Sequence, residues 1–569
     1  MDGRGIVDLG IQNFEQLRER DAFYVDKTNF IKDWWDNGAT ATLITRPRRF
    51  GKTLNLSMLE CFFSNKYADR GDMFQGLSIW NEKKFRSHQG AYPVIFLSFA
   101  KIKSTDYAGM EYAITKIIFD IYEQNRYLLE GDVLSDREKQ YYESIVPGME
   151  KKIVVDAINA LTNFVSRYHN NRVIILLDEY DTPMQEAWLS GYWNEATDFF
   201  RGFFNATFKS NPYMLKGLIT GITRISKESI FSDLNNLEVL TTTSNKFAPY
   251  FGFTESEVFQ ALDDMGFSEE KQGVKKWYDG FTFGNIADVY NPWSISSFIG
   301  NGAVYKSYWA DTSSNGLVNR LIRESSADIK KDFEWLLNGK TIIIPIDEQM
   351  IYDQLGKDEN ALWSLLLAGG YLKVVSIDNS HIGDSLEDEK YELALTNHEV
   401  RRMFAKMIRG WFNGRSKSGY NEFIKALLED NIKKMNAFMN RIALETFSSF
   451  DSGKRPSQDA EPERFYHGFV LGMVVDLSDR YRIRSNRESG YGRYDVMLEP
   501  FDKKDKAFIF EFKVLDKVEN ELSLEETVAN ALAQIETKKY EAELVADGIL
   551  PENIKKYGFA FEGKKCLIG

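Results

Sequence analysis

The amino-acid sequence predicts an α/β protein of several domains: a large domain built on a parallel sheet, a mostly helical connecting segment, and a second, smaller α/β domain. Three observations support this prediction. The chain has 569 residues, which is too long for a single hydrophobic core. Short apolar runs alternate with helix-like stretches over its first half, as in proteins with parallel sheets. Two strand-like runs near the carboxy terminus are separated by a short polar turn.

The first half of the chain contains the elements of one α/β domain. Its strand-like runs are ATLIT (41–45), PVIFLSF (93–99), RVIILL (172–177) and LKGLITGI (215–222). Its helix-like stretches include 106–125 and 150–168. Because helices separate the strands, we expect a parallel sheet with helices on both faces, and we assign residues 1–285 to this domain.

The rest of the chain is predicted to form two further parts. Residues 286–400 are more irregular and helical and are interpreted as a connecting domain, in which Pro292 suits the first turn of a helix. Residues 401–569 are assigned to the carboxy-terminal domain. Within it, the polar stretch 448–464 has the Ser, Pro and Gly content of an exposed loop, and the helix-like segment 465–477 follows.

The composition is that of a folded protein, because 43% of the residues are hydrophobic and 14% aromatic, with only 12 prolines. Two cysteines and five scattered histidines are too few for a disulfide framework or a zinc site, and this usage fits the reducing cytoplasm. We see no export signal in MDGRGIVDLG, and apolar runs such as 173–177 are much shorter than the roughly 20 residues that cross a membrane. The net charge of -13 argues against a surface that binds nucleic acid everywhere, but it allows a local basic channel.

The stretch LITRPRRFGKTL (43–54) ends as a phosphate-binding loop does, with Gly51-Lys52-Thr53 between a strand and a helix. Lys52 would reach the terminal phosphates of a nucleotide, and the Thr53 hydroxyl would bind Mg²⁺. Arg46 stands where the first glycine of this motif belongs, so a basic loop that merely ends in GKT is the alternative. The backbone N–H groups expected to cradle the phosphates are those of Arg48, Arg49, Phe50, Gly51, Lys52 and Thr53.

A second motif supports the nucleotide site. The apolar strand RVIILL leads into Asp178-Glu179, in which the aspartate would hold Mg²⁺ and the glutamate would orient or deprotonate the attacking water. An ordinary buried strand with acids at its exposed end is the alternative. Because both motifs occur, each after its own strand, the sequence favours an ATP site. Thr220 and Arg224, at the end of the next strand, could sense the terminal phosphate and offset its charge.

The carboxy-terminal strands carry acids that would meet across a hairpin. If residues 501–505 form the turn, Asp495 lies opposite Glu511, and Lys513 shares the face of Glu511. Two carboxylates that hold Mg²⁺ and a lysine that activates a water are the arrangement of a metal-dependent nuclease. A solvated charged face is the alternative, but Glu511 sits between Phe510 and Phe512, where a charge needs a partner.

The segment before this hairpin, DRYRIRSNRESGYGR (479–493), holds five arginines against two acids. In an acidic chain this is a local basic patch with interleaved tyrosines, which suits a phosphate backbone.

With these motifs in view, the sequence resembles the bacterial AAA-ATPase-like proteins that carry a carboxy-terminal PD-(D/E)XK nuclease-family domain. The resemblance runs nearly end to end. It rests on FYVDKTNFI (23–31), RPRRFGKT (46–53), LLDEYDTP (176–183), ITGITRISKESIFSDLNNL (219–237), FGFTESEV (251–258), WYDGFTFG (277–284), YNPWSI (290–295), FYHGF (465–469), SNRESGYGRYDV (485–496) and ALAQIETKKY (531–540). It implies a P-loop NTPase domain of the AAA-like, parallel-sheet type, then the helical segment, then a nuclease-like α/β domain.

The resemblance also implies roles for single residues. It implies ATP and Mg²⁺ at Lys52, Thr53, Asp178 and Glu179, and a nuclease core at Asp495, Glu511 and Lys513. Glu488 resembles the extra acid that many such nucleases bring from a preceding element, and Gln534 and Tyr540 resemble a trailing motif. Two departures are Arg46 in the phosphate loop and a plain GRYD in place of the Pro-Asp of the superfamily name.

The leading hypothesis is an ATP-binding, Mg²⁺-dependent nuclease that acts on DNA rather than RNA, with the nucleotide site regulating the nuclease site. The alternative is a nucleotide-dependent switch whose nuclease-like domain binds nucleic acid or a protein without cleaving. A remodeller that works as a ring ranks last, because no arginine can be assigned to a neighbouring subunit's site. The sequence leaves an oligomer open.

Overall fold

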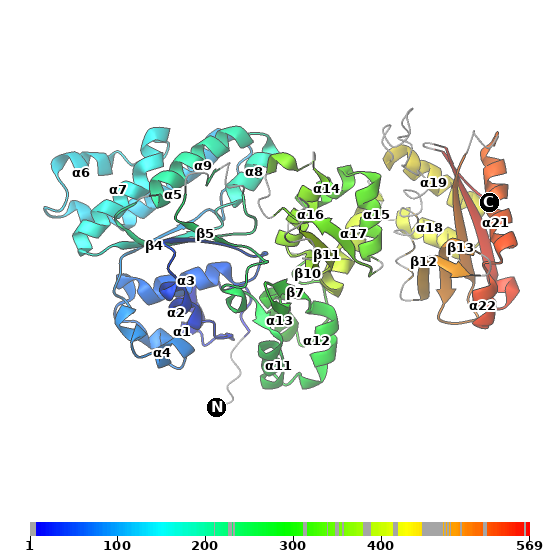
Figure 1. Cartoon of the computed structure of the whole chain (residues 1–569), viewed down its shortest axis with the longest axis horizontal. Coiled ribbons are helices and arrows are strands. Elements are labelled where there is room, and N and C mark those ends of the chain that lie inside the picture. The colour runs from blue at the N-terminus through cyan, green and yellow to red at the C-terminus, as the bar shows by residue number, and fades with distance from the viewer. Residues whose placement is uncertain are drawn as a thin grey trace. The chain divides into compact units, whose positions relative to one another are not determined.

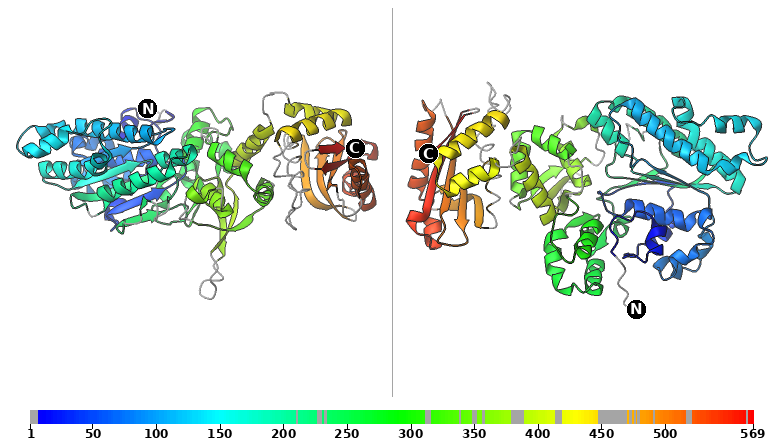
Figure 2. Two further views of the ribbon diagram at one scale, coloured as in Figure 1. Left: turned by 90° about the horizontal axis from the view of Figure 1, so that it is seen from above. Right: turned by 180° about the vertical axis from the view of Figure 1, so that it is seen from behind.

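The computed structural model of the chain divides into two compact units (Figures 1 and 2). The amino-terminal unit comprises Met1–Leu321 and Thr341–Arg401, and the carboxy-terminal unit comprises Ile322–Lys340 and Arg402–Gly569. The structure describes all residues except 1–6, 210, 226–229, 232–233, 311–315, 338, 348–351, 356–357, 379–388, 413–418, 447–469, 471–473, 475–476, 478–479, 490–491, 516–520 and 563–564. The predicted loop at 448–464 therefore lies outside the described residues, as does most of the helix-like segment 465–477. The domain boundaries at 285 and 400 stay predictions.

A five-stranded parallel sheet forms the centre of the amino-terminal unit. Its strands are β1 (Ala41–Thr45), β2 (Val94–Ser98), β3 (Val173–Asp178), β4 (Met214–Gly221) and β5 (Leu237–Leu240). Their order is β2-β3-β4-β1-β5, and all neighbouring pairs are parallel. The four strand-like runs of the sequence correspond to β1–β4, so the predicted parallel sheet is confirmed. The short, half-buried β5 was not predicted.

Helices cover both faces of this sheet, as the alternation of strands and helices predicted (Figure 1). One face carries α1 (Phe14–Glu19), α2 (Asn29–Asp36), α3 (Lys52–Phe63) and α4 (Ser78–Asn81). The other face carries α5 (Tyr107–Gln124), α6 (Asp136–Glu143), α7 (Lys151–His169), α8 (Thr182–Ser190) and α9 (Trp193–Phe208). Asp106 begins α5 by accepting the N–H of Gly109, and Asn170, in the left-handed conformation, ends α7.

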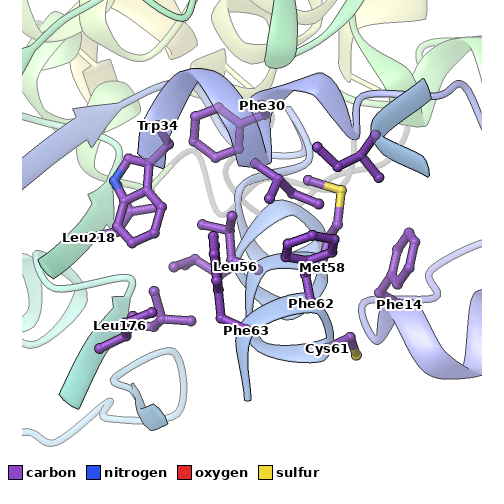
Figure 3. Close-up of a cluster of buried hydrophobic side chains, with 14 of the residues drawn as sticks. Phe14, Phe30, Trp34, Leu56, Met58, Cys61, Phe62, Phe63, Leu176 and Leu218 are labelled. Atoms are coloured by element: carbon purple, nitrogen blue, oxygen red, sulfur yellow. The ribbon is translucent and has the colours of Figure 1, made fainter. Parts of the chain in front are cut away.

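The helix after the phosphate loop is buried on most of its surface. Figure 3 shows Leu56, Phe62 and Phe63 of α3 packed among side chains of α2, β3 and β4. All three are fully buried. Because α3 is held from several sides, its first turn and the loop that precedes it have a fixed position against the carboxyl ends of the strands.

Three helices and a small antiparallel sheet follow the parallel sheet. The sheet has the order β6 (Phe253–Thr254), β8 (Ile286–Tyr290), β7 (Phe281–Phe283). The helices are α11 (Glu255–Asp264), α12 (Lys271–Tyr278) and α13 (Pro292–Gly300). Pro292 lies in the first turn of α13, as predicted, and Asn291 caps the helix by accepting the N–H groups of Trp293 and Ser294.

The middle of the chain is helical, with α14 (Gly316–Glu324), α15 (Ala327–Leu337), α16 (Glu359–Ala368) and α17 (His398–Phe412). It also holds an antiparallel sheet that the sequence analysis did not predict, in the order β10 (Leu372–Asp378), β11 (Lys390–Leu395), β9 (Ile342–Pro345). The sheet is partly exposed; Ile343 of the apolar run IIIP, for example, is 66% exposed.

A five-stranded mixed sheet forms the centre of the carboxy-terminal unit, in the order β12 (Tyr481–Ser489), β13 (Gly492–Pro500), β14 (Ala507–Val514), β15 (Ile554–Glu562), β16 (Lys565–Ile568). Only β14 and β15 pair in parallel. The helices α18 (Gly419–Leu428) and α19 (Ile432–Thr446) lie on one face, and α21 (Leu524–Lys538) and α22 (Ala542–Ala546) on the other (Figure 1). The two predicted strands correspond to β13 and β14, with the turn between them.

Candidate functional sites

The phosphate loop joins β1 to α3 at the carboxyl edge of the parallel sheet. Gly51 has a φ of +79°, which glycine adopts without strain, and it begins α3. The Lys52 ammonium donates hydrogen bonds to the carbonyl oxygens of Arg46 at 2.9 Å and Pro47 at 2.8 Å. Burial lowers the pKa of Lys52, and the carboxylates of Glu179 and Asp178 oppose this effect. The ammonium therefore lies inside the loop whose backbone would surround a phosphate.

Polar side chains from α3 and from two adjacent strands, β3 and β4, meet beside this loop. Thr53 Oγ1, in the first turn of α3, donates to Asp178 Oδ2 at 2.7 Å, and Thr220 Oγ1 donates to Asp178 Oδ1 at 2.7 Å. Asp178 is buried, and burial raises its pKa, while the hydrogen bonds from Thr220 and Thr53 act in the opposite direction. A hydroxyl and a carboxylate brought together in this way are hard oxygen ligands suited to Mg²⁺.

Glu179 follows directly and has a backbone φ of +52°, which is uncommon outside glycine. Its carboxylate accepts a hydrogen bond from Thr182 Oγ1 at 3.1 Å. Glu179 lines the same cavity as Lys52 and Thr53, so the structure brings these three predicted residues together.

The cavity at this edge has a volume of about 480 Å³, within the range of small-molecule sites. Its lining includes polar and charged residues: those of the loop, Lys103, Glu179 and Gln185. Other lining residues are apolar. The apolar lining comes from Leu9, Ile11, Phe23, Val25, Phe253 and Trp293. A cavity lined both by groups that can bind an anion and by apolar side chains has the chemistry that a nucleotide requires.

Arg46, the departure from the glycine of the motif, is a structural residue. Its side chain is fully buried, and Nη1 donates to the carbonyl oxygens of Thr45 at 2.8 Å and Thr241 at 2.5 Å. The guanidinium also lies over the rings of Phe283 (4.9 Å) and Phe251 (5.6 Å). Burial lowers the pKa of Arg46 to about 9, so the group stays charged at neutral pH.

Replacing Arg46 by glycine restores the usual loop residue, but we expect it to destabilise the domain by about 2–4 kcal/mol. The substitution leaves a cavity beside two aromatic rings, and the Thr241 carbonyl oxygen keeps the N–H of Ser244 as a donor but loses the guanidinium. Unfolding in urea, followed by fluorescence, measures the change. Arg46→Met keeps most of the volume and should cost less than Arg46→Gly; a glycine variant as stable as the wild type would contradict this structural role.

The structure does not bring Arg224 to this cavity. Arg224 instead lines a small cavity of about 30 Å³ with Thr45, Thr241 and Asp347. The hydroxyl of the adjacent Thr223 donates a hydrogen bond to the Asp181 carboxylate. It also forms a hydrogen bond with the Tyr352 hydroxyl, 3.1 Å away.

The hairpin of the carboxy-terminal unit has the predicted register. Val496 lies opposite Phe510, Met497 opposite Ile509 and Leu498 opposite Phe508. Continued by one residue, this register puts Asp495 opposite Glu511. Asp495 Oδ2 accepts the backbone N–H of Phe512 at 2.8 Å.

Glu511 is 3% exposed, and it lies on the sheet face that carries α21. The Gln534 amide of α21 donates to the Glu511 carboxylate and to the Tyr540 hydroxyl at 3.2 Å. The pKa of Tyr540 is raised, first by burial and also by the nearby charges of Glu511 and Asp495, although the bond from Gln534 acts in the opposite direction. The two acids, Gln534 and Tyr540 therefore form one cluster.

Lys513 lies two residues beyond Glu511 on β14 and is half-buried, so the alternation of the strand puts both on one face. Glu488 lies in β12 with its backbone opposite Arg493; its side chain is outside the described residues.

The charge of the predicted basic patch is partly neutralised by acids: Arg480 pairs with Asp505 at 2.7 Å, and Arg484 pairs with Glu499 at 2.6 Å. These pairs could not be seen in the sequence because the acids come from later strands and turns.

Two acids beside these sites were not predicted: Asp181, which is buried, and Glu257, which is half-buried. Asp181 Oδ2 accepts the N–H groups of Ile222 (3.0 Å) and Thr223 (2.8 Å), which ties the segment after β3 to the turn after β4. Its position in DEYD, three residues after Asp178, was the signal in the sequence that could have identified it.

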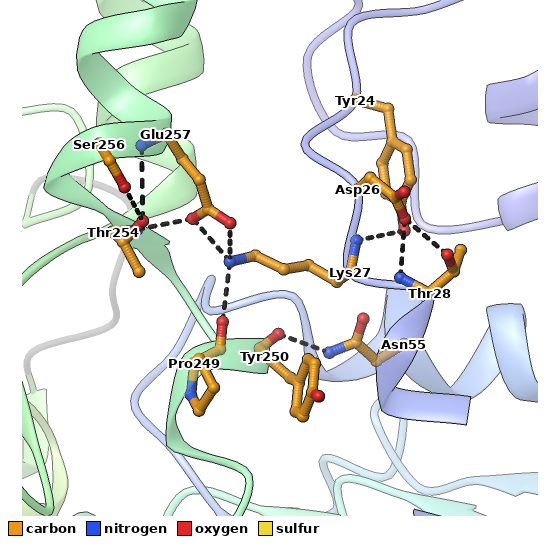
Figure 4. Close-up of polar contacts among 10 residues, drawn as sticks. All are labelled: Tyr24, Asp26, Lys27, Thr28, Asn55, Pro249, Tyr250, Thr254, Ser256 and Glu257. Atoms are coloured by element: carbon orange, nitrogen blue, oxygen red, sulfur yellow. Dashed lines mark hydrogen bonds and ion pairs between the residues drawn. The ribbon is translucent and has the colours of Figure 1, made fainter. Parts of the chain in front are cut away.

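Glu257 accepts a hydrogen bond from the Lys27 ammonium at 2.6 Å, and Lys27 also donates to the Pro249 carbonyl oxygen (Figure 4). This bridge holds α11 to the segment before α2, at the border of the cavity.

A third group of acids lies on the small sheet and the helices around it. Asp279 lies beside Asp288 and Glu255, with Lys275 and the Tyr290 hydroxyl as the other facing groups. Burial and the charge of Asp288 raise the pKa of Asp279 to about 6.

Because this pKa is raised in the folded state, the folded protein binds the proton more tightly than the unfolded chain between pH 4 and 6, and stability falls as pH rises through this window. We therefore expect Asp279→Asn to stabilise the protein at pH 7.5 by about 1 kcal/mol, after allowance for solvent screening. Thermal unfolding of both proteins at several pH values measures this. At low pH the gain should vanish; a gain independent of pH would contradict the explanation.

Two protein families match this chain. Residues 8–231 match the family described as a predicted AAA-ATPase, and residues 461–569 match the PD-(D/E)XK nuclease superfamily. The chain thus has an AAA-ATPase-like domain at its amino-terminal end and a PD-(D/E)XK nuclease superfamily domain at its carboxy-terminal end. The family resemblance and the fold class that the sequence predicted are confirmed.

An uncharacterized protein from the vnfD 5' region of Azotobacter chroococcum mcd 1 is 27% identical to this chain over 328 residues. The match covers 56% of this chain and 57% of that relative, so it spans little more than half of each. Among solved structures, the Aeropyrum pernix ORC2 protein in ADPNP and ADP complexes is similar at 10% identity and a TM-score of 0.22. That similarity covers 69% of this chain and 93% of the other, and at this TM-score it supports no further comparison.

Among the described residues, no helix combines the length and the apolar character needed to cross a membrane.

Proposed function

We propose that this protein binds ATP with Mg²⁺ in its amino-terminal domain, that it is a Mg²⁺-dependent nuclease acting on DNA, and that the nucleotide regulates cleavage. The observation that carries the nuclease proposal is the cluster of Asp495, Glu511 and Gln534 on one face of the carboxy-terminal sheet. Two acids at adjacent positions of a hairpin, one of them buried, are costly without a cation. The family match of this domain supports the same chemistry.

The residues of the amino-terminal site fit ATP and Mg²⁺. Lys52 would exchange the carbonyl oxygens of Arg46 and Pro47 for phosphate oxygens, which carry more negative charge. Thr53 and Asp178 would hold Mg²⁺, and the N–H groups at the start of α3 would bind phosphate. Glu179 would orient the attacking water, and Thr220 keeps Asp178 in place.

The carboxy-terminal residues also fit a divalent cation. Asp495 and Glu511 would hold Mg²⁺, which supplies charge neutralisation and lowers the pKa of water when bound. Gln534 fixes the Glu511 carboxylate, and Lys513, on the same face, would stabilise negative charge on the phosphate that is cut.

A buried hydrogen-bond link supports regulation by the nucleotide. Trp293 and Ser296 of α13 line the nucleotide cavity, and Ser294 of the same helix donates to Glu399 at 2.8 Å. Glu399 also accepts the N–H of Trp309 at 2.6 Å and is fully buried. It lies at the start of α17, whose later residues belong to the carboxy-terminal unit. A change at α13 would therefore act on the start of this connecting helix.

The test is incubation of single-stranded and double-stranded DNA, and of RNA as a comparison, with the full chain and Mg²⁺ or Mn²⁺, with and without ATP. Metal-dependent cleavage of DNA that changes with ATP is the expected result. Binding of DNA and ATP without cleavage under any of these conditions would overturn the nuclease proposal and favour a nucleotide-dependent switch that only binds nucleic acid.

A further inference from the structure

The phosphate loop carries arginines in place of small residues, and the structure gives their side chains different surroundings. Arg46 is buried between Phe251 and Phe283, away from the cavity. Arg48 and Arg49 are both among the residues that line the nucleotide cavity. The contacts of these two side chains decide which guanidinium can reach the phosphates of a bound nucleotide.

Arg49 is directed toward α13. Its backbone has a φ of +66°, a conformation that costs an arginine about 1 kcal/mol and persists only where other contacts maintain it. Its guanidinium lies 4.4 Å from the ring centroid of Trp293. This stacking holds the Arg49 charge beside the indole of Trp293, which also lines the cavity.

Arg48 is directed toward α8, and with Gln185 it lines both the nucleotide cavity and a second, small cavity of about 40 Å³. Its Nη2 donates to Gln185 Oε1 of α8 at 3.3 Å, and its carbonyl oxygen accepts the amide of Asn291 at 3.3 Å. Gln185 also lines the cavity, together with Glu179 and Thr182 from the same segment. Arg48 and Gln185 thus line the same cavity as Lys52, the lysine that would bind the terminal phosphate.

We infer that Arg48 is a catalytic residue for ATP hydrolysis and that it is supplied by the same chain. This inference rests on the proposed function as an ATP-binding domain. A guanidinium held between the loop and α8 can donate N–H groups to the oxygens of the transferring phosphoryl group. Many ATPases and GTPases receive such an arginine from a second protein. Here the loop itself provides it, and Gln185 holds it in position.

In the reaction, the oxygen of a water molecule forms a bond to the γ-phosphorus, and the bond from that phosphorus to the bridging oxygen of ADP breaks. The electron pair of that bond stays on ADP, and a water proton passes through Glu179 to solvent. Arg48 stabilises the negative charge on the γ-phosphoryl oxygens while the bonds change. The products are ADP and inorganic phosphate.

The experiment compares the wild type with Arg48→Ala, Arg48→Lys and the surface control Arg126→Ala, whose side chain is 60% exposed. Three quantities are measured: ATP hydrolysis at saturating ATP over a wide range of protein concentration, the Kd for a fluorescent ATP analogue, and retention of ADP with aluminium fluoride, a mimic of the transferring group. Circular dichroism and thermal unfolding check that each variant folds.

Both Arg48 variants should lose about 100-fold or more in kcat. The Kd should change by less than about fivefold, because the interaction forms mainly in the transition state. Retention of ADP with aluminium fluoride should be lost, and hydrolysis per molecule of wild type should not change on dilution. Arg126→Ala should behave as the wild type.

Wild-type kcat in a folded Arg48→Ala variant, or wild-type activity that disappears on dilution, would overturn the inference while leaving the nucleotide site intact. The proposed function fails separately if the wild type shows no ATP binding or if Lys52→Ala binds ATP as well as the wild type. A wild type that binds ATP but never hydrolyses it would overturn the catalytic role of Arg48 alone.

Discussion

Replacing Glu511 by alanine is expected to lower metal-dependent DNA cleavage by about 1000-fold or more, because the site then loses one of the two carboxylates that would hold the cation. Glu511 is buried, lies next to Asp495 on the hairpin register, and accepts a hydrogen bond from Gln534. Its removal leaves the Gln534 amide bonded only to Tyr540 among these groups. Cleavage of labelled DNA over time, with Mg²⁺ or Mn²⁺, measures the loss.

Controls separate loss of the site from loss of the fold. Glu511→Gln keeps the size of the side chain and removes its charge, so it should be equally inactive but as stable as the wild type or more stable, because no charge is then buried. Glu525→Ala removes an exposed acid from the first turn of α21 and should leave cleavage unchanged. Titration with Mn²⁺ should show one weaker site in Glu511→Gln. Cleavage by this variant at the wild-type rate would contradict the assignment.

Replacing Lys52 by alanine is expected to weaken ATP binding by about 100-fold, because charge-assisted hydrogen bonds from the ammonium to the terminal phosphates are lost. In the structure Lys52 is 6% exposed, and the hydrogen bonds of its ammonium go to the carbonyl oxygens of Arg46 and Pro47 within the loop. The change should therefore cost little stability in the absence of nucleotide. Equilibrium binding of a fluorescent ATP analogue measures the affinity.

The same variant tests regulation. If the nucleotide controls the nuclease, Lys52→Ala should cleave DNA at a rate that no longer responds to ATP, whereas Lys84→Ala, an exposed lysine before a surface turn, should respond normally. A Lys52→Ala protein whose cleavage still changes with ATP at wild-type concentrations would show that the nucleotide acts elsewhere.

Much of the fold could be predicted because its signals are local. The runs 41–45, 93–99, 172–177 and 215–222 are apolar, short and separated by helices, which identifies buried parallel strands. The hairpin register followed from a five-residue turn by counting back to Asp495 and Glu511, because side chains alternate strictly along a strand. β9 was missed because its partner β11 is distant in the sequence, and β10 because its apolar residues Val375 and Ile377 are exposed.

The sequence by itself determined the chemistry that is available: a GKT loop after a strand, acids at the end of the next buried strand, and a glutamate between two phenylalanines. It did so because each of these is a contiguous pattern. Only the tertiary structure decided which residues meet. It places Thr220 against Asp178, turns Arg46 into the core, leaves Arg224 in a separate small cavity and directs Arg48 toward Gln185. Those outcomes depend on packing between strands and helices that are far apart in the chain, and no local pattern of residues encodes them.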